Sequence, residues 1–391
     1  MFPKLSDLLD YLFGIRINLP VQTYGFFMAC AFMAAAWIVW LELKRKEKEG
    51  QIHSRTRTVW KGRSATAWDL ASTGIIGFII GYKLIGMIVD YADFAATPQD
   101  YILSAQGSWI GGILLGALSV FSTYYKRHKA KLDKPVKIQE TVHPYQLTAS
   151  IVLVAAVFGI IGSKIFDVFE HLGDLARDPV GTLFSFSGLT FYGGLIVASF
   201  AVIFYSERNK IPWPHIADTV APALILAYAI GRIGCQLSGD GCWGVENPDP
   251  KPAWLGFLPD WMWAFDFPHN VINEGNRINS CTGDHCFVLS VPVYPTSFYE
   301  TVMGCIIFVV LWLTRKKWII PGYLFSFYLI LNGIERFLIE FIRINQRYRF
   351  LGIELSQAQW IAILLILLGA AGFWFFKIKS KSKDQRAKIK T

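Results

Sequence analysis

The sequence predicts an all-α, polytopic membrane protein with about nine transmembrane helices. Of its 391 residues, 53% are hydrophobic and only 17% are charged. Apolar runs of about 20 residues, the length that an α-helix needs to cross a bilayer, recur along the whole chain. This composition excludes a soluble enzyme. The predicted spans are 21–42, 70–92, 107–125, 145–168, 188–205, 216–238, 296–314, 321–343 and 356–376.

Lys and Arg are unequally divided between alternate segments outside these spans. Segments 44–63, 126–137, 206–213, 315–317 and 377–391 carry 26 of them, whereas 1–20, 93–106, 168–187, 239–295 and 344–355 carry 7. Because cytoplasmic loops are rich in Lys and Arg, the N-terminus is expected outside, in the periplasm, and the C-terminus in the cytoplasm. The net charge of +9 is then mainly a topology signal, and no nucleic acid is expected as a partner.

Three segments differ from the transmembrane domain, which is expected to cover 21–376. Residues 1–20 place leucines at helical spacing with acidic residues between them, which predicts a periplasmic amphipathic helix on the membrane surface. The periplasmic insertion 239–295 is rich in Trp and Phe, which favour the headgroup layer. The basic cytoplasmic tail 377–391 has few apolar residues and is expected to be disordered.

Residues 81–107 align without gaps on residues 162–188, at an offset of 81, and one residue later Gly111-Gly112 matches Gly193-Gly194. Both copies run outward through an acidic loop and back. This predicts a duplicated hairpin in parallel orientation, unlike the inverted repeats of many transporters.

Two of the six cysteines, Cys281 and Cys286, lie close together in the insertion 239–295, where oxidation is possible. A disulfide between them would close over Thr-Gly-Asp-His. A zinc site from Cys281, His285 and Cys286 is disfavoured, because no fourth ligand has suitable spacing.

Polar residues form three clusters near the outer ends of spans. Arg232 ends an apolar run and leads into a glycine-rich loop with Asp240; Tyr299 and Glu300 begin another span; and a third span carries Glu335, Arg336, Glu340 and Arg343. A charge at such a place is costly unless it is paired, so it indicates a functional site.

Two readings of these clusters remain open. Arg336 and Glu340 share a helix face and can pair, and this pair could serve helix packing alone. Alternatively, the topology brings Arg232 and Arg336 to one membrane face, where two guanidiniums could hold a phosphate. Tyr24 and Tyr192 lie beside glycines within spans, as packed rings or as site residues.

Five motifs, in order, resemble those of bacterial prolipoprotein diacylglyceryl transferases. Gly231-Arg232-Ile233-Gly234 with Gly239-Asp240 and Gly244 resembles the family signature. The others are Tyr24-Gly25, Phe191-Tyr192-Gly193-Gly194, Tyr294-Pro295-Thr296-Ser297-Phe298-Tyr299-Glu300, and Gly333 through Arg343. Together they cover residues 24–343 and match the expected topology.

This resemblance implies transfer of the sn-1,2-diacylglyceryl group of phosphatidylglycerol to the lipobox cysteine of a preprolipoprotein, in the bacterial inner membrane. It implies no metal or other cofactor, and a monomer is expected. Arg232 and Arg336 would be catalytic, with Tyr192 in the position of the family's histidine. The implied substrate-binding residues include both arginines with Tyr24, Gly193, Gly194, Cys235, Asp240, Gly244, Tyr299, Glu300 and Glu340.

The chain departs from the family at several of these positions. Tyr192 replaces a histidine that could act as a base, Cys235 replaces an asparagine, and one extra residue near Gly241 lengthens the loop. Compared with the family, the hairpin 70–125 and much of the segment 239–295 are additions. A catalytically inactive lipid-binding relative and a membrane transporter are therefore the alternatives. A CDP-alcohol phosphatidyltransferase is disfavoured, because no span carries its series of metal-binding aspartates.

Overall fold

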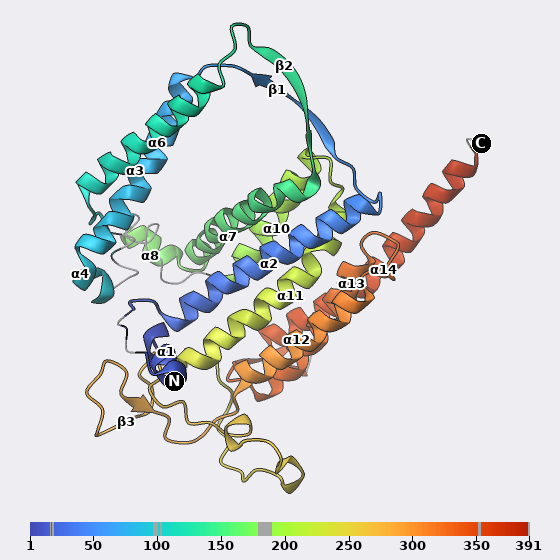
Figure 1. The fold of residues 1–391 in the computed structure, drawn as a ribbon. Coiled ribbons are helices and arrows are strands. Elements are labelled where there is room, and N and C mark those ends of the chain that lie inside the picture. The colour runs from blue at the N-terminus through green and yellow to red at the C-terminus, as the bar shows by residue number, and fades with distance from the viewer. Residues whose placement is uncertain are drawn as a thin grey trace. The chain divides into compact units, whose positions relative to one another are not determined.

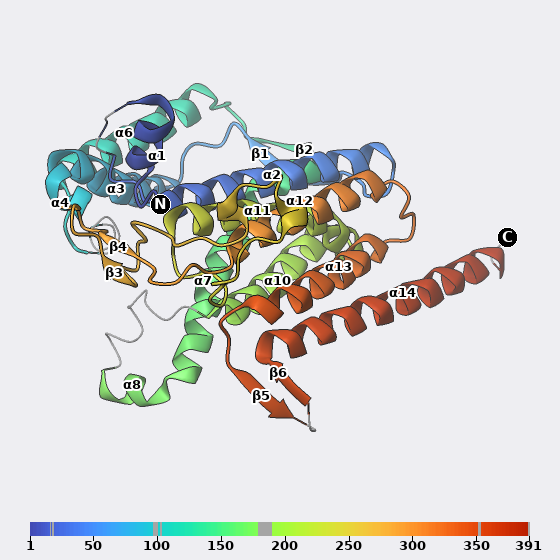
Figure 2. The ribbon, with the colours of Figure 1, turned by 90° about the horizontal axis from the view of Figure 1, so that it is seen from below.

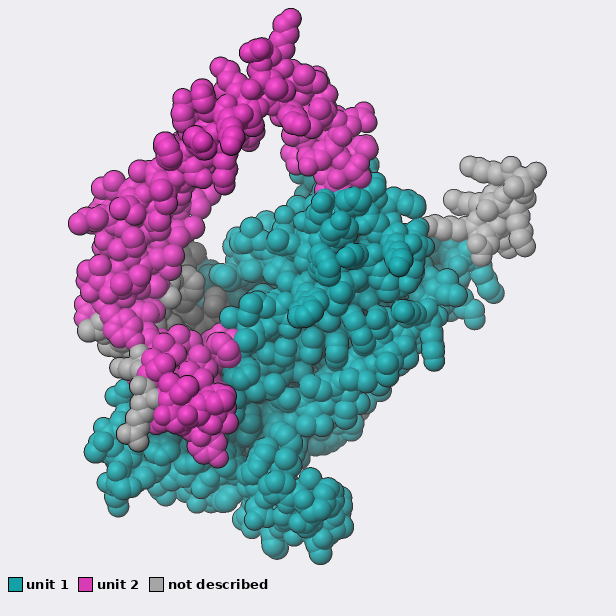
Figure 3. Space-filling model, in the orientation of Figure 1, with its two compact units in different colours: residues 1, 27–55, 143–391 teal, residues 2–26, 56–142 magenta. Residues whose placement is uncertain are grey.

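The computed structural model describes residues 1–391 except 16, 18, 97–100, 102–103, 179–189, 351–352 and 390–391. The chain divides into two compact units (Figure 3). The first comprises residue 1, 27–55 and 143–391, and the second comprises 2–26 and 56–142. Each unit is described by itself.

The second unit is built around a helical hairpin. Helices α3 (Ala67–Val89) and α6 (Trp109–Lys129) lie side by side and are joined through α4 (Tyr91–Ala96) (Figure 1). Strands β1 (Arg55–Lys61) and β2 (Val136–Val142) pair with each other. The short helix α1 (Leu5–Phe13) lies where the sequence predicts an amphipathic helix.

The first unit contains most of α2 (Thr23–Lys48) and the helices that follow strand β2. In order, these are α7 (Thr148–Glu170), α8 (Leu172–Arg177), α10 (Phe191–Arg208), α11 (Trp213–Ser238), α12 (Thr296–Thr314), α13 (Tyr323–Ile339) and α14 (Gln357–Ile389). Figure 2 shows α13 and α14 side by side, with β5 (Arg347–Phe350) and β6 (Ile353–Ser356) as a hairpin between them. Short 3-10 helices are Pro144–Leu147, Ala253–Leu255, Asp260–Met262 and Glu340–Ile342, and β3 (Asn276–Arg277) pairs with β4 (Phe287–Val288).

The protein is a helical membrane protein, as predicted. Within the described residues, six helices are long and apolar enough to cross a membrane: α2, α3, α7 with its preceding turn, α11, α12 and α14 up to Lys381. Helices also occupy the other three predicted spans, as α6, α10 and α13. These three are shorter or end in charged residues.

Helix α14 continues from the last predicted span into the basic tail 377–391, as far as Ile389. An existing helix is extended by Lys, Arg, Gln and Ala without the cost of nucleating a new one.

Helix α11 is the central helix of the first unit. Half of its apolar window is buried inside the protein, compared with 11–33% for the other five candidate spans. Its buried residues Ile216 and Ala223 pack with α2, and Ile225 packs with α12 and α13. This packing fixes the helix that carries Arg232.

The predicted duplication is visible in the helix boundaries. Helices α3 and α7 start 81 residues apart and end 81 residues apart, and so do α4 and α8. Both hairpins close on a glycine contact: a Cβ on Gly81 would lie 2.3 Å from the Gly111 carbonyl oxygen, and one on Gly162 would lie 2.5 Å from that of Gly193. Three of the aligned pairs, at 98/179, 104/185 and 107/188, have a member outside the described residues.

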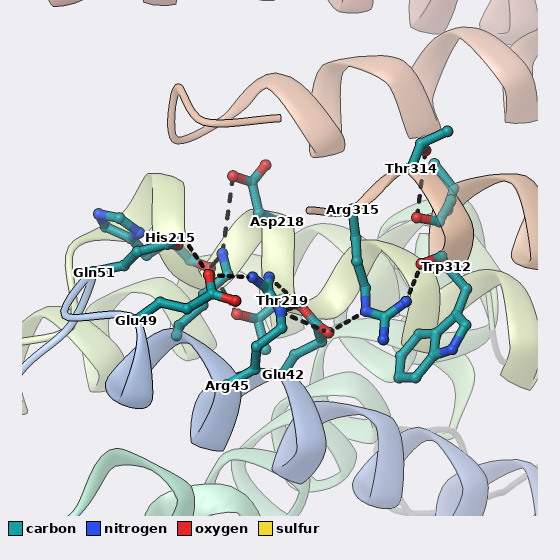
Figure 4. A network of polar contacts seen from close by, with 12 residues as sticks. Glu42, Arg45, Glu49, Gln51, His215, Asp218, Thr219, Trp312, Thr314 and Arg315 are labelled. Atoms are coloured by element: carbon teal, nitrogen blue, oxygen red, sulfur yellow. Dashed lines mark hydrogen bonds and ion pairs between the residues drawn. The ribbon is translucent and has the colours of Figure 1, made fainter. Parts of the chain in front are cut away.

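A buried polar network connects α2, the N-terminal half of α11 and the start of α13 (Figure 4). Arg232 lies in the C-terminal half of α11, away from this network. The carboxylate of Asp218 in α11 accepts hydrogen bonds from the backbone N–H groups of Gly322 (2.8 Å) and Phe325 (2.9 Å). These are donors that the start of α13 would otherwise leave unpaired. Glu42 of α2 pairs with Arg45 and Arg315 close by. The network fixes the start of α13, the helix that carries Arg336.

The glycine contact between α7 and α10 can be tested by adding one methyl group. We expect Gly162→Ala to lower the free energy of unfolding by about 1–3 kcal/mol, because its Cβ would overlap backbone and the side chain of Val197. The matched control is Gly159→Ala in the same helix, where the nearest atom to the added Cβ is 4.0 Å away. Thermal unfolding in detergent measures both, and equal stability of the two variants would contradict the prediction.

Candidate functional site

The side chain of Glu300 lies at the centre of the candidate site. It is fully buried in the first turns of α12, and three arginines contact it. Oε2 lies 3.1 Å from Nε of Arg232, while Oε1 lies 3.2 Å from Nη1 of Arg336 and 2.9 Å from Nη1 of Arg343. The two predicted arginines are therefore brought together, and one carboxylate holds them.

The partner of Arg232 differs from the one that sequence order suggests. Arg232 and Asp240 are neighbours along the chain, but the carboxylate that Arg232 contacts is Glu300. Its guanidinium also lies over the ring of Tyr228, 5.1 Å from the centroid. The hydroxyl of Tyr228 in turn donates to Glu335 at 3.3 Å. Helix α11 thus orients Arg232 through its own preceding turn and through α12.

The end of α13 supplies the other two arginines. Arg336 pairs with Glu340, as the four-residue spacing predicts, with Nη2 3.1 Å from Oε2. The α-helix ends at Ile339, and the chain continues as the 3-10 helix Glu340–Ile342. An uninterrupted helix to residue 343 was predicted, whereas Arg343 follows the 3-10 helix in extended backbone and contacts the same oxygen of Glu300 as Arg336 does. Asn345 donates to the remaining oxygen of Glu340.

Gly244 allows the glycine-rich loop to cross the end of α13. Its N–H donates to the carbonyl of Tyr294 at 2.8 Å, and it forms a bridge with Arg343. A Cβ here would lie 2.4 Å from the carbonyl oxygen of Ile342, which is backbone and cannot move aside easily. A glycine is required at this crossing.

The arginines of the cluster keep hydrogen-bonding capacity beyond their ion pairs. Arg232, Arg336 and Arg343 face two ion-paired carboxylates, Glu300 and Glu340. Each guanidinium has five N–H donors, and the contacts to described residues use only some of them. Their side chains are 15–23% exposed, against 0–1% for the two carboxylates. An anion can therefore reach the arginines.

Tyr192 lies in the first turn of α10 and is partly exposed. It interacts electrostatically with Arg336 and Glu340, so this predicted residue belongs to the same site. The two glycines after it pack against α7: a Cβ on Gly193 would meet Phe166 at 2.5 Å, and one on Gly194 would meet Ser163 at 2.3 Å. These glycines bring α10 close to α7 and so position Tyr192.

The loop after α11 places two thiols beside the arginines. Cys235 is buried, and its sulfur accepts from Nη1 of Arg232 at 3.8 Å. A hydrogen bond from the Cys235 thiol holds the pKa of the Cys242 thiol below its usual value, and the charge of Arg232 acts in the same direction. Asp240 accepts from the backbone N–H of Cys242 at 3.1 Å. Cys242 was not predicted as a site residue, and its position seven residues after Cys235 is the signal that could have indicated it.

Two further predicted site residues are Tyr299 and Tyr24. The hydroxyl of Tyr299 donates to the carbonyl of Met262 at 2.6 Å, and its ring lines an apolar cavity of about 350 Å³ that also touches Trp263 and Ile342. Tyr24 belongs to the second unit, where it is exposed in the first turn of α2.

The disulfide that the sequence allows in the insertion is present. Cys281 and Cys286 form a disulfide, which removes both sulfurs from the disfavoured zinc site with His285.

The fold and the site together define a helical membrane protein with an anion-attracting arginine cluster at one end of its bundle. The profile of the prolipoprotein diacylglyceryl transferase family matches residues 133–375, more than half of the chain. The chain belongs to this family.

Relatives named phosphatidylglycerol–prolipoprotein diacylglyceryl transferase are similar to it over long stretches. The one from Oceanobacillus iheyensis is 30% identical over 224 residues, covering 57% of this chain and 70% of the relative. The one from Dehalococcoides mccartyi is 28% identical over 278 residues, covering 71% and 92%. The one from Paraburkholderia phymatum is 28% identical over 211 residues, covering 52% and 67%.

The dependence of the arginines on Glu300 can be tested by removing its charge alone. We expect Glu300→Gln to destabilise the protein by about 3–5 kcal/mol, because three part-buried arginines would lose a shared counter-ion. Glu246→Gln, at an exposed position, is the matched control. Detergent-solubilised protein measured by thermal unfolding gives both values. A Glu300→Gln variant as stable as the control would show that the carboxylate does not organise the site.

Proposed function

We propose that this protein transfers the sn-1,2-diacylglyceryl group of phosphatidylglycerol to the lipobox cysteine thiol of preprolipoproteins and releases glycerol phosphate. The observation that carries the proposal is the group of three arginines around Glu300. It occurs in a chain of the prolipoprotein diacylglyceryl transferase family. This makes the protein an enzyme of lipoprotein maturation.

The transfer reaction requires stabilisation of the negative charge that develops on the leaving phosphate. The thiol sulfur attacks C3 of the glycerol, the C3–O bond breaks, and the phosphate gains one negative charge. Arg232 and Arg336 are the catalytic residues that we assign to this step, because preorganised donors stabilise charge where it develops. Glu300 and Glu340 are positioning residues that hold the guanidiniums. Arg343 adds a third positive charge to the same place.

The proposed topology has nine spans, with the N-terminus in the periplasm and the C-terminus in the cytoplasm of a bacterial inner membrane. The distribution of Lys and Arg supports it, with 26 on the expected cytoplasmic segments and 7 on the others. The helices α6, α10 and α13 would add three spans to the six candidate spans, which gives nine. The site then faces the periplasm, and the protein acts as a monomer.

A second candidate is a relative that binds the lipid and does not transfer it. Tyr192 in the place of a histidine favours this candidate, since a phenol is a weak base near neutral pH. The proximity of Tyr192 to Arg336 instead fits a role in binding the phosphate or the peptide. One assay separates the two candidates.

The assay incubates membranes containing this protein with a lipobox peptide and phosphatidylglycerol, and detects the diacylglyceryl thioether by mass spectrometry. We expect modification of the cysteine peptide and none of a peptide with serine in its place. Phosphatidylethanolamine should not replace phosphatidylglycerol. Binding of phosphatidylglycerol without thioether formation would favour the inactive relative.

Removing either Arg232 or Arg336 tests the assignment of the catalytic residues. We expect Arg232→Ala and Arg336→Ala to lower the rate of transfer by about 10²–10³-fold each, the usual effect of losing one donor to a developing anion. Arg349→Ala removes an exposed arginine of β5 and should leave the rate unchanged. Amounts of protein in the membrane are compared by immunoblot. Full activity of Arg232→Ala or of Arg336→Ala would contradict the mechanism in which both arginines stabilise the leaving phosphate.

A further inference from the structure

Three potential metal ligands meet at the loop that follows α11. The sulfurs of Cys235 and Cys242 and a carboxylate oxygen of Asp240 all lie within 4.8 Å of one another. Among the described residues, this is the one group of three or more Cys, His, Asp or Glu side chains with such spacing. In a tetrahedral zinc site the ligand atoms are about 3.5–4 Å apart, so a small contraction would bring these three to zinc-binding distance.

The loop holds the three side chains by backbone contacts. Gly239 and Gly241 have φ values of +66° and +86°, which turn the chain back after the helix. The carbonyl of Cys242 accepts hydrogen bonds from Thr296 at 2.7 Å and Ser297 at 3.1 Å. Cys242 is thus tied to the start of α12, while Cys235 is fixed in the last turn of α11. The two sulfurs are brought together from different elements.

The donor set and the local charge suit zinc. Zinc is borderline-soft and takes Cys and Asp ligands, and sites with three protein ligands keep a fourth position for water or substrate. Two thiolates and a carboxylate exceed the charge of Zn²⁺ by one unit. That excess negative charge would face Arg232, whose Nη1 lies 3.8 Å from the sulfur of Cys235.

We propose that Cys235, Asp240 and Cys242 bind a zinc ion whose fourth position receives the lipobox thiol. This inference rests on the proposed transfer reaction and departs from the expectation of no metal. A thiol that coordinates zinc is deprotonated, and here its proton would pass to water. The site therefore supplies the activated nucleophile that the phenol of Tyr192 is poorly suited to generate.

The atoms of the reaction balance with this site. The bound sulfur forms its bond to C3 of the glycerol while the C3–O bond breaks, and that electron pair leaves on the phosphate held by Arg232 and Arg336. The product sulfur is then an uncharged thioether. It is a weaker zinc ligand than the thiolate was, so the lipidated peptide leaves and the position is free for another thiol.

Metal binding is measured on the full chain in detergent, stripped with a chelator and reloaded with zinc. We expect about one zinc per chain by elemental mass spectrometry. Cys235→Ser and Cys242→Ser should each reduce zinc content at least tenfold, and Cys242→His, which keeps a zinc ligand, should retain most of it. Cys305→Ser, at an exposed position in α12, is the matched control. Zinc content equal in all variants would overturn the proposed site.

Cobalt(II) is the probe for the fourth ligand. In the loaded protein we expect thiolate-to-cobalt absorption that depends on Cys235 and Cys242. This absorption should increase when a lipobox peptide with cysteine is added, and remain unchanged with the serine peptide. An unchanged spectrum with the cysteine peptide would overturn the role of the metal in binding the thiol. A Cys235–Cys242 disulfide found by peptide mapping of the protein isolated without added oxidant would overturn the metal site itself.

Measurements of transfer activity distinguish a failure of the zinc site from a failure of the proposed transfer reaction. Full transfer activity in chelated protein, and in Cys235→Ser and Cys242→Ser, would overturn the zinc inference and leave the transfer reaction intact. Zinc binding and thiol ligation in a wild-type protein that transfers no lipid would overturn the transfer reaction alone. Loss of transfer with the chelator and recovery with zinc is the result that we expect.

Discussion

The whole site depends on one buried carboxylate with three arginine partners. Glu300 is fully buried, and a buried carboxylate is costly unless it is paired. The same holds for the guanidiniums of Arg232, Arg336 and Arg343, which would repel one another without it. Because these residues come from the ends of α11, α12 and α13, the ion pairs also fix how the three helices end relative to one another. The site can bind an anion through the guanidinium N–H groups that these ion pairs do not use.

Much of the architecture could be predicted from the sequence because it depends on local patterns. Apolar runs indicated the helices, and the offset of 81 residues indicated a duplication that appears in the boundaries of α3 and α7. The pairing of Arg336 with Glu340 follows from helix periodicity alone. Such features can be predicted from residues within one or two helical turns of each other, or by aligning the sequence with itself.

The centre of the site could not be predicted in the same way. Glu300 lies 36 residues from Arg336 and 43 from Arg343, and the sequence assigned these residues to separate clusters. Their meeting depends on how α12 and α13 pack against each other. The approach of Cys242 to Cys235 likewise depends on a loop held by α12. These are tertiary effects, which no local pattern encodes.

The two copies of the hairpin have the same helix contact but differ at the position of Tyr192. In α6 the residue before the paired glycines is Ile110, where α10 has Tyr192. Yet the same backbone hydrogen bond joins the helices in each copy, from Ser108 to Tyr82 and from Thr190 to Ser163. The chain thus contains a version of its own site hairpin from which the phenol is absent. The glycine contact and the backbone hydrogen bond of this hairpin therefore do not depend on the phenol, because the first copy keeps both with Ile110 at the equivalent position.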